Sequence, residues 1–259
     1  MKSEQQQRHS AQIPKVIHYC WFGRTPLPEL ATKCIASWRK FLPGYTIKEW
    51  NEDNFDVYQA PYVAEAYRLK SYAHVSDYAR FWILYHYGGI YFDTDVEIIR
   101  PIDDILARGA FAGFEPPEGT SNDNPHGNMA AGLGLAAPPG HPFFAHMAGY
   151  YAHHHYVNWN GRSTGNVIFT ATQFLDYSHK QVLDGGIVSV SGLYIYPEDY
   201  FCPLNYYTGE LRITPNTRTI HHYMASWVKR QSRLRTAFQR LHFIYTRILC
   251  TVKHNYSDL

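Results

Sequence analysis

Apolar residues in the first hundred positions fall into short runs with the spacing of strands or of helices. Residues 16–22 form an apolar run that ends at a glycine, and residues 45–50 alternate between apolar and polar, so both are predicted to be strands. Prolines at 26 and 28 open a predicted helix that continues to residue 38, and a second helix is predicted over 62–72. Residues 1–12 are polar and are expected to be a disordered tail.

The clearest pattern lies between residues 76 and 99. Ser76 is placed to cap a helix with Asp77 in its first turn, and the helix is predicted to stop at two glycines, 88 and 89. Residues 90–92 then read as a buried strand, with Asp93-Thr94-Asp95 at its carboxyl end, and residues 96–99 resume an extended run. In parallel sheets, ligands bind beyond the carboxyl ends of strands, so the two acids are expected at a binding site.

The second half of the chain is less regular. A loop is predicted over residues 115–128 and a strand over 131–137. Helices are predicted over 141–151 and 167–177, and short strands are expected around residues 188 and 195. Strands and helices alternate in the first half. That alternation predicts an α/β fold with a mostly parallel sheet flanked by helices.

Composition narrows the class of protein. The net charge of +2 argues against a nucleic-acid partner, and the 16 % aromatic content is compatible with a sugar-binding surface. The four cysteines are scattered and form no C-x-x-C pair, which argues against a zinc site and favours a reducing compartment. The sequence has no apolar signal-peptide run and no stretch of about 18 apolar residues, so a cytoplasmic location is expected.

The D-x-D triplet is the strongest candidate for chemistry. Carboxylates two positions apart on an extended chain point to the same side, where they repel each other unless a cation lies between them. A divalent metal would also bind phosphate oxygens and accept negative charge as a diphosphate leaves. Most such triplets are solvated turns, but the apolar residues before Asp93 and Asp95 favour a metal site.

Two further clusters have both an ordinary and a functional interpretation. Asp77 and Arg80 are three residues apart on one helix, so they form either a surface ion pair or a pair that holds sugar hydroxyls. His221 and His222 are either structural or supply a metal ligand, and imidazole favours a transition metal over magnesium. The histidines at 153–155 are a weaker candidate, because a helix end favours histidine for electrostatic reasons alone.

Four segments together resemble the family 32 glycosyltransferases, the group with a D-x-D sugar-binding region, and most closely bacterial capsular or surface polysaccharide transferases. They occur in this order: IPKVIHYCWFG (13–23), SDYARFWILYHYGGIYFDTDVE (76–97), PPGHPFF (138–144) and HHYMASW (221–227). The resemblance implies a GT-A catalytic domain over 13–228, a nucleotide-sugar donor and retention of anomeric configuration. It also implies a divalent metal, Mn2+ with Mg2+ as the alternative.

The resemblance also assigns residues. It implies that Asp93, Asp95 and His221 hold the metal. Asp77 and Arg80 match the family's S-D-x-x-R, which contacts the donor, and Asp95, Asp77 and Arg80 are the expected catalytic group. Trp21 matches a residue near the nucleobase, and Ser226 and Trp227 match residues near the diphosphate. Ala130-Ala131-Gly132 and Thr164-Gly165-Asn166 depart from the family pattern, which leaves the acceptor open.

The expected activity is therefore transfer of a hexose from a nucleotide-sugar, with a UDP-sugar favoured, to a glycan or lipid-linked glycan in surface polysaccharide synthesis. A metal-dependent hydrolase of nucleotide-diphosphate sugars and a non-catalytic carbohydrate-binding protein are the alternatives. Residues 229–253 contain no acid, seven basic residues and an apolar stripe with helical spacing. This basic amphipathic segment, followed by a tail to residue 259, is either a helix packed on the domain or a peripheral membrane contact.

Overall fold

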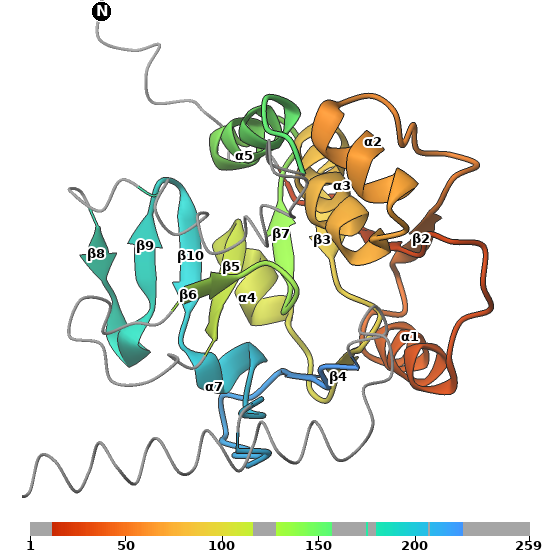
Figure 1. Cartoon of the computed structure of the whole chain (residues 1–259). Coiled ribbons are helices and arrows are strands. Elements are labelled where there is room, and N and C mark those ends of the chain that lie inside the picture. The colour runs from red at the N-terminus through yellow and green to blue at the C-terminus, as the bar shows by residue number, and fades with distance from the viewer. Residues whose placement is uncertain (1–11, 116–127, 157–174, 176–179, 207, 225–259) are drawn as a thin grey trace, which may run out of the picture.

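The structure, a computed structural model, describes residues 12–115, 128–156, 175, 180–206 and 208–224. Its centre is a nine-stranded sheet in the order β2-β1-β3-β7-β5-β10-β9-β8, with β6 paired to β5 (Figure 1). The strands are β1 (Val16–Cys20), β2 (Thr46–Trp50), β3 (Gly89–Tyr91), β5 (Phe111–Glu115), β6 (Asn128–Ala130), β7 (Leu135–Ala137), β8 (Gln181–Val182), β9 (Val188–Val190) and β10 (Leu193–Tyr196).

The directions of the strands confirm the predicted class. β1 pairs in parallel with β2 and β3, and β5 pairs in parallel with β10. β7 lies antiparallel between β3 and β5, so these two strands also share a direction. β6 is antiparallel to β5, and β9 is antiparallel to β10 and β8. Six strands thus run one way and three run the other, which makes the sheet mixed but mostly parallel.

Helices cover both faces of this sheet. Neighbouring residues of each strand point to opposite faces, and apolar residues on both faces pack against helices. Tyr91 packs in a cluster with the apolar faces of α2 (Pro61–Arg68), α3 (Tyr72–Tyr87) and α5 (Pro142–Ala152). Its neighbour Ile90 packs in a second cluster with residues of α1 (Glu29–Phe41), α4 (Asp103–Arg108) and α7 (Glu198–Phe201). The result is the helix–sheet–helix sandwich seen in Figure 1.

Two helix boundaries differ from the prediction. α2 ends at Arg68 and not at residue 72, because Lys70 adopts a left-handed φ of 56° and breaks the helix. α3 begins at Tyr72, so Ser76 lies inside the helix and does not cap it. The hydroxyl of Ser76 donates to the carbonyl of Tyr72 at 3.1 Å, a bond that serine makes inside a helix, whereas a serine that caps a helix accepts from a backbone amide.

The predicted stop at Gly88 and Gly89 is confirmed, and it determines where β3 begins. Both glycines have positive φ, 62° and 93°. A Cβ at Gly88 would lie 2.6 Å from the backbone nitrogen of Pro139, and one at Gly89 would lie 2.7 Å from the carbonyl oxygen of Val16. Only glycine fits this close passage, which brings the end of α3 directly into the sheet.

A second, two-stranded sheet joins the middle of the chain to its later part. β4 (Val96–Ile98) pairs antiparallel with β11 (Thr219–His221), and His221 lies opposite Val96. β4 follows the D-x-D triplet directly, so this pairing carries His221 to the carboxyl end of β3 (Figure 1).

The remaining segment predictions divide in two. The strands expected around residues 188 and 195 are β9 and β10, and the run 131–137 contributes β7 only from Leu135. The basic segment 229–253 lies outside the described residues, as do residues 1–11 of the predicted tail, all of the predicted helix 167–177 except residue 175, and nearly all of the loop 115–128. Within the described part of the chain, no helix combines the length and hydropathy needed to cross a bilayer.

Candidate metal and donor site

Asp93 and Asp95 lie at the carboxyl end of β3, as predicted, but in a turn and not on an extended strand. The amide of Val96 donates to the carbonyl of Asp93 at 3.1 Å and closes this turn. The amide of Asp93 lies 3.4 Å from the carbonyl oxygen of Gly132, beyond the neighbouring strand. Asp95 is 7 % exposed, so its carboxylate is held inside the protein and is not a solvated surface group.

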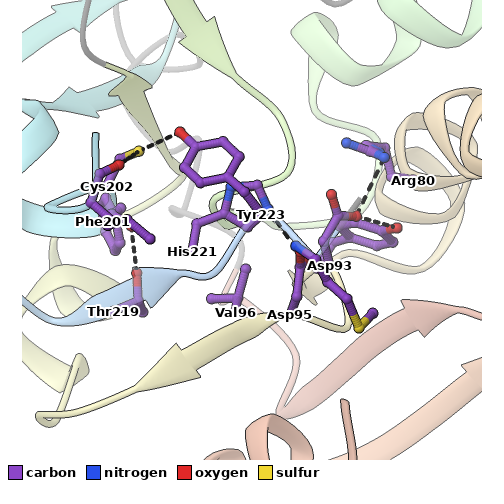
Figure 2. A network of polar contacts seen from close by, with 12 residues as sticks. Arg80, Asp93, Asp95, Val96, Phe201, Cys202, Thr219, His221 and Tyr223 are labelled. Atoms are coloured by element: carbon purple, nitrogen blue, oxygen red, sulfur yellow. Dashed lines mark hydrogen bonds and ion pairs between the residues drawn. The ribbon is translucent and has the colours of Figure 1, made fainter. Parts of the chain in front are cut away.

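His221 completes a group of three ligand atoms with these acids. Its Nε2 lies 3.2 Å from Oδ1 of Asp95. One carboxylate oxygen of Asp93, one of Asp95 and one ring nitrogen of His221 all lie within 4.8 Å of one another. Figure 2 shows the three side chains converging from the β3–β4 turn and from β11. The residues that were predicted to hold a metal are therefore brought together.

The charges of the Asp93 and Asp95 carboxylates are only partly neutralised by the groups around them. Burial raises the pKa of Asp93, and Arg80 and His221 only partly offset that effect. Burial acts in the same direction on Asp95, but His221 and the Met224 amide outweigh it and hold the pKa of Asp95 below its usual value. Burial would lower the pKa of His221, but the two carboxylates raise it. A cation between these groups would stabilise both carboxylates in their charged form.

The surroundings fit a divalent metal. Two carboxylate oxygens and one imidazole nitrogen suit Mn2+, and Mg2+ less well because it prefers oxygen ligands. Gly132 leaves the space beside Asp93 open, since a Cβ there would lie 2.4 Å from Oδ2 of Asp93. Two hydrogen bonds also orient the carboxylates. Tyr91 donates its hydroxyl to Oδ1 of Asp93 at 3.0 Å, and the amide of Met224 donates to Oδ2 of Asp95 at 2.7 Å.

Asp77 and Arg80 are buried, so their interpretation as a surface ion pair is wrong. Nη2 of Arg80 lies 2.8 Å from Oδ1 of Asp77 and 3.3 Å from Oδ1 of Asp93. The guanidinium also lies over the ring of Tyr91, 5.1 Å from its centroid. Burial raises the pKa of Asp77, and the charge of Arg80 opposes this shift. Arg80 thus joins the Asp77 carboxylate to the group formed by Asp93, Asp95 and His221.

Residues 28–112, which include Asp77, Arg80, Asp93 and Asp95, match the family described as "Glycosyltransferase sugar-binding region containing DXD motif". The D-x-D region of this chain is thus similar to the sugar-binding region of that glycosyltransferase family. The match covers β2, β3 and both acids of the D-x-D triplet, whereas β1 and His221 lie outside it.

Relatives with curated names are also glycosyltransferases by name. The chain is 30 % identical over 162 residues to inositol phosphoceramide mannosyltransferase 1 of Schizosaccharomyces pombe, which covers 58 % of this chain and 44 % of that protein. It is 32 % identical over 136 residues to mannosyl phosphorylinositol ceramide synthase CSH1 of Saccharomyces cerevisiae, covering 51 % of this chain and 33 % of the relative. The chain thus spans less than half the length of either relative.

A solved glycosyltransferase structure, from a protein involved in glycosylation of the major capsid of PBCV-1, shows a weak likeness. It is 11 % identical, has a TM-score of 0.48 and covers 89 % of this chain and 99 % of the other. A score of this size adds nothing to the family match, which rests on residues 28–112.

The structure separates the histidines that were candidates for a metal ligand. His222 points to Glu97, with Nε2 2.8 Å from Oε2, and is not among the three converging ligand atoms. His155 contacts Glu65 through Nδ1 at 2.6 Å, and the residues 153–155 are exposed beyond the end of α5. Of the three histidine candidates, only His221 reaches the acids.

The donor residues taken from the family resemblance are only partly placed. Trp21 follows β1 and is partly buried, and its indole N–H donates to the carbonyl of Thr25 at 2.7 Å. It is therefore outside the group of metal-ligand candidates, and its contact with a nucleobase stays a prediction. Ser226 and Trp227 lie outside the described residues.

Sequence reasoning missed several residues that support the ligands. Tyr91 precedes Asp93 by two positions and could have been found from the same alternation that places both on one side of a strand. Gly132 was noted only as a departure from the family pattern. Tyr223 and Met224 lie within the HHYMASW segment, but nothing in its spacing indicates that the backbone there turns back to Asp95.

Proposed function

We propose that this chain is a metal-dependent, retaining glycosyltransferase that moves a hexose from a nucleotide-sugar to a hydroxyl of a glycan or glycolipid. The observation that carries the proposal is the convergence of Asp93, Asp95 and His221 next to the buried Asp77–Arg80 pair. This arrangement offers a cation site and charged side chains at the same strand end, within a region that matches a sugar-binding family.

The roles of the residues follow from their positions. Asp93, Asp95 and His221 would hold the metal, which supplies positive charge to the leaving diphosphate. Asp77 and Arg80 would orient the donor sugar, and Arg80 at the same time fixes the carboxylate of Asp93. In the transfer, the bond from the anomeric carbon to the diphosphate oxygen breaks and a bond to the acceptor oxygen forms on the same face. The acceptor proton passes to the departing diphosphate.

The relatives favour mannose as the sugar and a lipid headgroup as the acceptor, because the two named above are a mannosyltransferase and a mannosyl phosphorylinositol ceramide synthase. A nucleotide-activated mannose is accordingly the first donor to test, ahead of the UDP-hexoses favoured by the sequence alone. A role in surface or capsular polysaccharide synthesis remains a proposal that rests on the sequence resemblance.

One structural observation weighs against the hydrolase alternative. A two-metal hydrolase needs further acids close to the first pair. The next acid, Glu97, points to His222 at 2.8 Å, so in the described part of the chain it is engaged away from the three ligand atoms. A non-catalytic binding protein would have little use for two acids and an imidazole that converge on one point.

The test is a donor screen with and without an acceptor. The protein is incubated with Mn2+ and, in turn, GDP-mannose, UDP-glucose, UDP-galactose and UDP-N-acetylhexosamine, and both released nucleotide and glycosylated acceptor are measured. A transferase forms a new glycoside with retained configuration, a hydrolase releases free sugar at the same rate with or without acceptor, and a binding protein turns over neither. Asp95→Asn is the matched inactive variant, expected to lower the transfer rate about 100-fold or more while its unfolding temperature stays near that of the wild type.

A further inference from the structure

Tyr223 occupies a backbone conformation that tyrosine rarely adopts, and it does so two residues after His221. Its φ is 50°, in the left-handed region, which is energetically costly for a residue with a side chain. Glycine would avoid this cost, so a tyrosine here indicates that the side chain is needed. Such strained residues cluster at functional sites, where the surrounding contacts hold them in place.

The left-handed turn folds the chain back around Asp95. The amide of His222 donates to the backbone carbonyl of Asp95 at 3.0 Å, and the amide of Met224 donates to its carboxylate Oδ2 at 2.7 Å. The two donors lie on either side of Tyr223, so both bonds depend on the direction of the backbone at this residue. They leave Oδ1 of Asp95 facing His221 at 3.2 Å.

The side chain of Tyr223 ties the imidazole to the protein core. Its ring packs on His221, with the ring centroids 4.2 Å apart and the planes inclined by 49°. Its hydroxyl lies 2.9 Å from Sγ of Cys202, which is 1 % exposed and belongs to the cluster around Phe201. Figure 2 shows this chain of contacts running from Cys202 through Tyr223 and His221 to Asp95.

We propose that Tyr223 is a positioning residue that fixes the rotation of the His221 ring through its own ring and its anchor at Cys202, and thereby holds the metal site assembled before donor binds. The proposal rests on the metal-dependent function proposed above. Tyr223 contacts no reacting atom in this account, and its effect reaches the metal through the ligands alone. Residues that orient metal ligands in this way change metal affinity by about 10–100-fold when they are removed.

The test measures manganese binding, so it does not depend on activity. Mn2+ is titrated into the full-length protein and the free ion is followed by electron paramagnetic resonance, in the absence and in the presence of GDP. Tyr223→Gly keeps the left-handed turn but removes the ring, and is expected to raise the Kd for Mn2+ about tenfold. Tyr223→Phe keeps the ring but loses the anchor, and a smaller rise of about threefold is expected, with an unfolding temperature near that of the wild type.

A double-mutant cycle isolates the anchor. Cys202→Ala and Tyr223→Phe each remove one end of the same contact, so the double variant should bind Mn2+ no more weakly than either single variant. Cys202→Ser restores a hydrogen-bonding partner and should return the Kd to within about twofold of the wild type. Tyr67→Phe is the matched control. Tyr67 lies on α2 and its hydroxyl donates to a carboxylate oxygen of Glu52 at 3.2 Å, so removing this hydroxyl should leave the Kd for Mn2+ unchanged.

The outcomes are distinguishable. If Tyr223→Gly and Tyr223→Phe bind Mn2+ within twofold of a wild-type protein that does bind it, the positioning role is wrong and the proposed function stands. If Tyr223→Gly does not fold, the cycle of Tyr223→Phe and Cys202→Ala decides. Additive losses of Mn2+ affinity in the double variant would then show that the positioning role is wrong. If the wild type binds no Mn2+ with or without GDP, the metal assignment fails and this proposal fails with it.

Discussion

Acidification should destabilise the protein through His18, a histidine in the middle of β1 that is 2 % exposed. Its Nδ1 accepts a hydrogen bond from the indole N–H of Trp50 at 3.0 Å, so Nε2 carries the proton and donates to the carbonyl of Gly88 at 3.0 Å. A protonated ring would place an N–H at Nδ1 against the N–H of Trp50. Burial lowers the pKa of His18 to about 4, with the nearby Lys48 acting in the same direction and the Gly88 bond opposing.

The sign and size of the effect follow from this shift. An unfolded chain binds the proton with the usual pKa of about 6.5, so between pH 6.5 and 4 the unfolded state holds more protons than the folded state. Stability therefore falls as the pH falls through this window. The loss attributable to His18 is about 2 kcal/mol between pH 8 and pH 5 and about 3 kcal/mol by pH 4.

Urea unfolding at a series of pH values measures this loss. The same series on His18→Gln removes the titrating group, so the variant should start less stable at pH 8 but lose about 2 kcal/mol less than the wild type on going to pH 5. His86→Gln, at an exposed position of α3, is the control for a general histidine effect. Parallel pH profiles for the wild type and His18→Gln, within about 0.5 kcal/mol, would refute the reasoning.

Three other predictions concern the site and the basic segment. His221→Ala should raise the Mn2+ concentration needed for half-maximal transfer about tenfold or more, whereas His222→Ala should have a smaller effect; the reverse order in a Mn2+ titration would show that the ligand is misassigned. Gly132→Ala should weaken Mn2+ binding about tenfold, because the new Cβ would lie 2.4 Å from Oδ2 of Asp93. Gly149→Ala is the control, since a Cβ there meets nothing within 4 Å, and equal Kd values for both variants would contradict the argument from crowding. If the basic segment 229–253 contacts membranes, at about 1 kcal/mol per basic residue, the protein should sediment with anionic vesicles at low salt, release at high salt, and lose this binding on truncation after residue 229; indifference to the vesicles would leave the segment a structural one.

The parts of this protein that were predictable are those encoded by neighbouring residues. The apolar run before Asp93 predicted a buried strand, and the glycine pair at 88–89 predicted the end of α3, because each signal lies within a few residues of the feature. The start of α3 was misplaced because the Ser76 hydroxyl can bond a helix carbonyl as well as cap a helix. The burial of Arg80 could not be read from its helix, since it depends on α2, α5 and β3 closing around it.

The approach of His221 to Asp93 and Asp95 could not be predicted from residues near it in the sequence. It depends on the pairing of β11 with β4, two three-residue strands far apart in the chain, and short strands carry too little pattern to reveal their partner. The assignment of this histidine came from the family resemblance and not from spacing. The structure adds the reason for preferring it over His222: His221 is the last residue of β11 and its imidazole lies beside Asp95, whereas His222 follows the strand and its imidazole lies beside Glu97.

Arg80 links the two halves of the proposed site through charge. Asp77, Asp93 and Asp95 bring three negative charges into a buried region, and Arg80 supplies one positive charge between the first two. A divalent cation held by Asp93, Asp95 and a neutral His221 would bring the sum to zero, so the site is balanced when the metal is bound and short of positive charge when it is not. In the proposed reaction a donor diphosphate would add negative charge beside Arg80, which among the described residues is already paired with Asp77 and Asp93, so the proposed metal would stabilise the leaving group. It also means that removing Arg80 would disturb Asp93, a proposed metal ligand, as well as the proposed contact with the donor sugar, so the two roles cannot be separated by mutating that residue alone.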